Sequence, residues 1–162
     1  SKLNSNSKDL LRQQDFIFLL SLMIIDNTDN TDYFLYKFNI SKKDQKRIKI
    51  IDNFYKEKIS SKTFTEHNMN KVFYYHGKQA LLDILDFKIV KSRKIDNSLK
   101  ELRKNYINNI APKLPINADL LMKKYRISEG KQLGEKLKII EKEWVENNFK
   151  ISDQQVENII NN

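Results

Sequence analysis

The sequence has no cysteine, which excludes disulfides, thiolate zinc sites and a cysteine nucleophile and is consistent with a cytoplasmic location. It has three glycines and two prolines among 162 residues, so few positions break a helix. Long apolar runs are also missing. The most apolar stretch, FIFLLSLMII at 16–25, is about half of the ~20 residues that cross a bilayer, and it ends at Asp26. We therefore expect a buried helix there and no membrane partner.

Acidic residues are the scarcer charged type, with 21 Asp and Glu against 30 Lys and Arg, which gives a formal net charge of +9. The excess is confined to one part of the chain. Residues 41–104 carry 17 basic and 8 acidic side chains, whereas residues 1–40 and 105–162 are nearly neutral. A concentrated positive charge favours an anionic partner. We expect the cations of 41–104 to lie on one exterior surface.

Apolar residues spaced by three and four, with abundant Leu, Ile, Lys and Glu, predict an all-α fold. We expect a compact multi-helix bundle of about seven to nine helices. The predicted segments are 9–25, 32–37, 41–58, 68–75, 78–90, 97–110, 118–125 and 128–148, followed by a last helix that begins at Ser152. Residues 1–104 are expected to form a helical body with the basic middle segment, and residues 105–162 a helical tail packed on it.

Several residues are typical of helix starts and ends. Ser41 precedes Asp44 by three residues, in the pattern of a capping box, while Asn117, Ser128 and Ser152 are expected to cap the three later helices. Pro112 and Pro115 end the helical pattern between body and tail. In the long helix after Ser128, the apolar stripe of Leu133, Leu137, Ile140 and Trp144 predicts that the only tryptophan is in the core.

Two glycines lie one turn apart near the start of that long helix, Gly130 and Gly134, with Lys131 between them. Backbone N–H groups at a helix start have no partner within the helix, so a phosphate is able to approach them closely where side chains are absent. The alternative interpretation is close packing of the 118–125 helix against this turn. The spacing alone favours packing slightly.

The order of segments from Leu114 onward resembles the C-terminal part of bacterial class II tRNA nucleotidyltransferases, the CCA-adding and poly(A) polymerase family. The segments are LPINADLL, RISEGKQLGEKL and EWVENNF. The positions that match the family pattern are Pro115, Asp119, Leu120, Gly130, Gly134, Leu137, Trp144 and Phe149. Upstream, FNISKKDQKR at 38–47 and YYHGKQALLD at 74–83 are similar to family segments in the same order. The chain departs from the pattern at Ala118 and Lys131, where the family has glycine and proline.

The resemblance implies an RNA-binding portion of a nucleotidyltransferase that lacks the catalytic head. In the family, an Asp-x-Asp pair in a separate head domain holds Mg²⁺ and the nucleotide, and no Asp-x-Asp occurs here. We therefore expect no cofactor in this chain. Asp26, Asp29 and Asp32 are predicted to be loop and capping residues. Asp83 and Asp86 are predicted to form surface ion pairs with Lys78, Lys88 and Arg93.

The main hypothesis is the C-terminal portion of a CCA-adding tRNA nucleotidyltransferase or poly(A) polymerase that holds the tRNA acceptor and elbow, with tRNA and the catalytic head domain as partners. Phosphate contacts would carry the binding. The candidate RNA-binding residues are Lys42, Lys43, Lys46, Arg47, Lys78, Lys91, Arg93, Lys94, Lys123, Lys124, Arg126, Gly130, Lys131 and Gly134. Tyr74, Tyr75 and His76 are candidates for stacking on a base, or for the core. The alternative is a helical module that binds an acidic protein.

Overall fold

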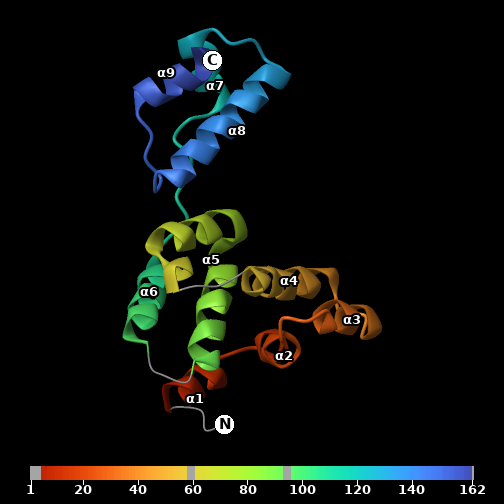
Figure 1. Ribbon diagram of the computed structural model, residues 1–162. Coiled ribbons are helices and arrows are strands. Elements are labelled where there is room, and N and C mark those ends of the chain that lie inside the picture. Colours follow the sequence, from red (N-terminus) through yellow and green to blue (C-terminus); the bar gives the residue numbers. More distant parts are fainter. Residues whose placement is uncertain (1–4, 58–60, 93–95, 162) are drawn as a thin grey trace. The chain divides into compact units, whose positions relative to one another are not determined.

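The computed structural model describes residues 5–57, 61–92 and 96–161, and over these residues it contains nine α-helices, one short 3-10 helix and no strand (Figure 1). The all-α prediction is confirmed. The chain divides into two compact units, Ser1–Ile110 and Ala111–Asn162. The sequence placed this division after residue 104, which lies inside the helix Asn97–Asn108 (α6). Over the described residues, no helix combines the length and hydropathy needed to cross a membrane.

The helices agree closely with the periodicity of the sequence. The first unit contains α1 Ser5–Arg12, α2 Phe16–Ile24, α3 Asn30–Lys37, α4 Lys42–Lys56, the 3-10 helix η1 Ser61–Phe64, α5 Glu66–Lys91 and α6 Asn97–Asn108. The second unit contains α7 Ala118–Tyr125, α8 Lys131–Glu146 and α9 Asp153–Asn161.

Helix α5 is the central element of the first unit, where it contacts α1, α4, α6 and η1. Gly77 interrupts it with φ 83° and ψ 173°, so α5 is two helical halves joined by a kink, as the sequence predicted. A left-handed φ of this kind favours glycine. Residues from both halves, among them Phe73 and Leu85, form one core cluster with α6. A second cluster joins α2, α3 and α4 around Phe18 and Ile48.

The prediction of one helix over 9–25 was wrong. The chain breaks between α1 and α2, where the Asp15 carboxylate accepts a hydrogen bond from the Phe18 N–H at 2.9 Å and caps α2. A capping aspartate competes with continuation of the preceding helix, and this outweighed the periodicity. The expectation that the run is buried holds for one face only, because Phe18 is fully buried whereas Phe16 is 70% and Met23 81% exposed.

The second unit is a small helical cluster around Leu121, Leu133, Ile140 and Val156. Trp144 is buried, as predicted, and its ring centroid lies 4.9 Å from that of Phe149. The cap of α8 was predicted wrongly. Helix α8 begins after Gly130, not at Ser128, because Gly130 adopts φ 148° and turns the chain into the helix.

The other predicted caps are confirmed. The Ser41 hydroxyl accepts from the Asp44 N–H at 3.2 Å, and the Asn117 side chain accepts from the Leu120 N–H at 2.9 Å. The Ser152 hydroxyl accepts from the Gln155 N–H at 3.2 Å.

Candidate nucleic-acid interface

Helix α4 begins with a cluster of cationic side chains, Lys42, Lys43 and Lys46, which we call the α4 lysine cluster. All three are exposed, and none pairs with a carboxylate of the residues that the structure describes. The nearest acidic residue in sequence, Asp44, accepts a hydrogen bond from the Ser41 hydroxyl at 2.6 Å as part of the helix cap. The positive end of the helix dipole adds to the charge of the lysines. This cluster presents uncompensated positive charge to solvent.

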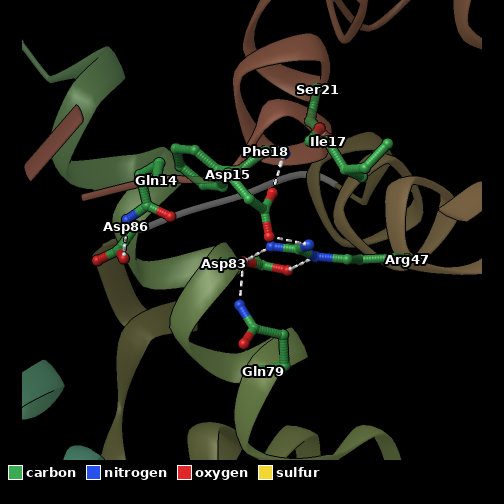
Figure 2. A network of polar contacts seen from close by, with 9 residues as sticks. All are labelled: Gln14, Asp15, Ile17, Phe18, Ser21, Arg47, Gln79, Asp83 and Asp86. Carbon is green, nitrogen blue, oxygen red and sulfur yellow. Dashed lines mark hydrogen bonds and ion pairs between the residues drawn. The ribbon is translucent and has the colours of Figure 1, made fainter. Parts of the chain in front are cut away.

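Arg47 follows the α4 lysine cluster in sequence but is oriented inward (Figure 2). Its guanidinium donates to both oxygens of Asp83, at 2.7 and 2.9 Å, and to Asp15 at 2.5 Å. Asp83 is 1% exposed and also accepts from the Gln79 amide at 2.9 Å. The hydrogen bond to Asp83 raises the pKa of Arg47 although burial opposes it. The charge of Arg47 is therefore compensated inside the fold.

The pKa of Asp15 is set by opposing effects. Desolvation raises it, but the hydrogen bonds from Arg47 and from the Phe18 N–H, with the charge of Arg47, outweigh burial and leave the pKa below its usual value. Asp15 thus performs two tasks, since it caps α2 and also joins α2 to α4 through Arg47.

A second buried carboxylate, Asp86, lies one turn along α5 and is 2% exposed. Arg103 of α6 donates to both of its oxygens, and the Gln14 amide donates to it at 2.8 Å. Burial is the larger effect and raises the pKa of Asp86 despite Arg103. The prediction that Asp83 and Asp86 form surface ion pairs was wrong: both are buried and both bind arginines.

Two more lysines of the first unit, Lys49 and Lys56, are also compensated by carboxylates. Lys49 and Lys56 pair with Asp32 and Asp52, so the expectation that all cations of 41–104 share one free surface was too broad. Lys78 donates to the Ile107 carbonyl at 2.9 Å, and Lys91 donates to the Leu22 carbonyl at 3.0 Å. A carbonyl does not neutralise a cation, but these contacts tie each side chain to the surface. Arg93 and Lys94 lie outside the described residues.

The prediction for the three aspartates near α3 holds for Asp26 as a loop residue but not for capping by Asp29, whose side chain makes no cap hydrogen bond to α3. Asp26 accepts hydrogen bonds from Thr28 and Asn30 in an exposed turn, which lowers its pKa. Asp29 is the residue that precedes α3, and Asp32 lies in the first turn of that helix. Among the described residues, no three His, Cys, Asp or Glu side chains are close enough together to hold a metal ion.

The second unit has its cations around α7 and the start of α8. Lys123 and Arg126 are exposed, and Arg126 ends α7 in the left-handed conformation with φ 55°. Lys124 pairs with Asp153 at 3.4 Å, and Lys131 pairs with Glu135 at 3.7 Å. Both pairs are on the surface, where such interactions contribute little to stability and yield readily to another anion.

Close packing does not explain the two glycines of α8. A side-chain carbon added at Gly130 or Gly134 would meet no atom within 4 Å. The positive φ of Gly130 accounts for glycine at that position, since other residues rarely adopt it. Gly134 is an ordinary helical residue in open space. The start of α8 is thus exposed. Helix α7 does contact α8, as the packing interpretation expected, but that contact does not require glycine at either position.

The aromatic residues before the kink of α5 are partly accessible. Tyr75 is 54% exposed, His76 is exposed and Tyr74 is half-buried, and the two tyrosine rings meet edge to face at 5.2 Å. Tyr75 is therefore outside the core.

The network around Arg47 was missed from sequence, although one signal was present: Asp83 and Asp86 stand within the otherwise apolar stretch from Leu81 to Phe87.

Comparison with known proteins supplies the family. The model of the family described as tRNA nucleotidyltransferase domain 2 matches residues 10–160. No curated protein and no solved structure matches the chain.

Proposed function

Since the chain belongs to the tRNA nucleotidyltransferase domain 2 family, we propose that it is the RNA-binding portion of a CCA-adding tRNA nucleotidyltransferase or a poly(A) polymerase. It holds the acceptor and elbow of the tRNA by phosphate contacts, while a separate head domain with Mg²⁺ and nucleotide adds to the 3′ end. The protein acts in the cytoplasm. The observation that carries this proposal is the family match over nearly the whole chain, joined to the uncompensated α4 lysine cluster.

The mechanism of binding is electrostatic. Lys42, Lys43 and Lys46 are able to meet successive phosphates because they project from one end of α4 without carboxylate partners among the described residues. Side chains do not read the deep major groove of an A-form helix, so contacts of this kind recognise shape and position rather than base sequence. Binding should therefore depend strongly on salt and weakly on the sequence of the stem.

A secondary set of contacts belongs to the second unit. Lys123 and Arg126 are exposed, and Lys131 stands at the open start of α8 beside Gly130. Backbone N–H groups at such a helix start attract a phosphate, and the exposed ion pair of Lys131 is weak enough to be exchanged for one. Arg47 is excluded from the proposed surface because Asp83 and Asp15 already bind its guanidinium.

Filter binding with tRNA and with duplex DNA of equal charge, at two salt concentrations, tests the proposal. We expect tRNA to bind more tightly than the DNA, with log affinity falling linearly in log salt. Equal, weak affinity for tRNA and duplex DNA would mean that nonspecific charge attraction alone explains the binding. That result would favour the alternative, a helical module that binds an acidic protein.

A further inference from the structure

A cavity of about 400 Å³ opens in the first unit between α4, η1 and α5. Its volume lies within the range of roughly 300–1,000 Å³ that is usual for small-molecule sites. One face of α4 and one face of the first half of α5 line it, together with η1 and a residue beyond the kink. The lining residues are Ile50, Asn53, Phe54, Glu57, Thr63, Asn68, Lys71, Val72, His76 and Ile84.

The floor of the cavity is apolar. Ile84 is fully buried and Val72 is 9% exposed, while Ile50 and Phe54 of α4 are half-buried beside them. The two α5 residues come from opposite sides of the Gly77 kink, so the kink brings both to the same cavity. A floor of this kind accommodates the flat face of an aromatic ring, such as a nucleobase.

The rims of the cavity are polar on both sides. On α4, Asn53 and Glu57 are exposed beside the apolar floor, and on α5 the rim holds Asn68, Lys71 and His76. The Asn68 amide donates to the Thr63 carbonyl at 3.2 Å, which fixes how it is oriented. Amide and carboxylate groups match the hydrogen-bonding edges of bases, and a lysine matches a phosphate.

We propose that this cavity binds a single unpaired nucleotide of the RNA, a choice of ligand that rests on the function proposed above. The base lies on the floor of Ile50, Val72 and Ile84 with its edge toward Asn53 and Glu57 of α4. Its phosphate lies toward Lys71 on the opposite rim, away from the carboxylate of Glu57. The α4 lysine cluster would then hold paired RNA by its phosphates, while the cavity recognises one nucleotide outside the stem.

The first test uses mononucleotides, which do not require the polyanionic surface. AMP, GMP, CMP and UMP are titrated into the labelled protein, and the methyl NMR signals of Val72 and Ile84 are followed. We expect at least one nucleotide to shift both signals, and ribose 5-phosphate to shift neither. Asn53→Leu and Lys71→Met should each weaken binding roughly tenfold, the scale of one lost hydrogen bond or charge-assisted contact. The matched controls on α6, Asn105→Leu and Lys104→Met, should leave it unchanged.

The second test uses RNA. A hairpin with unpaired loop nucleotides and a fully paired duplex with equal phosphate count are compared, and Asn53→Leu should weaken only the hairpin. Equal losses for both RNAs, no methyl shift with any nucleotide, or shifts with N-acetyl-tryptophanamide alone would overturn the nucleotide site. Methyl shifts with nucleotides but no binding of either RNA would instead refute the function proposed above and leave the cavity as a nucleotide site.

Discussion

Replacing Arg47 with methionine is expected to lower the free energy of unfolding of the Ser1–Ile110 unit by about 3–5 kcal/mol, the cost of leaving a buried charge without its partner. Asp83 is 1% exposed and would keep only the hydrogen bond from Gln79. Loss of the ion pair between Arg47 and Asp15 adds little to this decrease in the free energy of unfolding. The Asp15 carboxylate is 54% exposed, and surface ion pairs contribute about 0–1 kcal/mol. Most of the loss therefore comes from Asp83.

Urea unfolding followed by far-UV circular dichroism measures this loss. The only tryptophan, Trp144, is in the Ala111–Asn162 unit, so its fluorescence reports that unit and should change less. Lys43→Met, on the exposed side of the same helix, is the matched control and should stay within about 0.5 kcal/mol of the parent. The double variant Arg47→Met with Asp83→Leu should recover much of the stability, because it removes the unpaired charge.

Two results would refute this reasoning. Arg47→Met as stable as Lys43→Met would mean that the carboxylate of Asp83 does not need its arginine. A double variant no more stable than Arg47→Met would mean that the loss comes from packing and not from an unpaired charge. In the first case Arg47 would return to the set of residues available for phosphate.

Four further predictions concern burial, titration and backbone geometry. Trp144→Ala should destabilise the Ala111–Asn162 unit by roughly 3–5 kcal/mol, measured by thermal melting, and an unchanged melt would remove Trp144 from the core. Asp15 has a lowered pKa, so its contribution to stability is present above the usual aspartate pKa of about 4 and is lost as the pH falls below it; the stability difference between the parent and Asp15→Asn should therefore shrink in acid. The pKa of Asp86 is raised, so the folded chain keeps the proton of this carboxyl up to a higher pH than the unfolded chain does. The parent should therefore lose stability relative to Asp86→Asn as the pH rises. If the stability difference from the parent changed with pH in the same way for Asp15→Asn and Asp86→Asn, both pKa directions would be contradicted. Gly77→Ala should cost about 1–3 kcal/mol because φ 83° and ψ 173° lie in a region that is essentially restricted to glycine, whereas Gly134→Ala, at a helical site in open space, should stabilise by about 0.5–1 kcal/mol; denaturant titration of both variants gives the comparison.

The helices were predictable because their signals are local. Gly77 predicted the interruption of α5, and Asn117 predicted the start of α7 at Ala118; Ser41 predicted the cap of α4. Where two local signals compete, as at Asp15, the apolar periodicity predicted the wrong structure. The apolar pattern runs through Asp15, yet its side chain satisfies the first N–H groups of α2 and ends the preceding helix.

The candidate site was less predictable, because the state of a cation depends on residues distant in sequence. Arg47 and Lys46 are neighbours and look equivalent in the sequence, but one binds Asp83, 36 positions away, and the other faces solvent. The same holds for the floor of the cavity, where Ile50 and Ile84 meet only after α4 packs on α5. Which lysines remain uncompensated is a property of tertiary packing and not of local composition.

The most direct measurement of the central claim compares two triple variants of equal net charge in tRNA binding. One changes the α4 lysine cluster, Lys42, Lys43 and Lys46, to glutamine, and the other changes three exposed lysines of the second unit, Lys138, Lys142 and Lys150. We predict that only the first lowers tRNA affinity strongly and reduces the slope of log affinity against log salt, by about 0.9 for each phosphate that is no longer neutralised. Equal losses in both variants, or no loss in the first, would contradict the claim that the start of α4 is where this protein meets RNA.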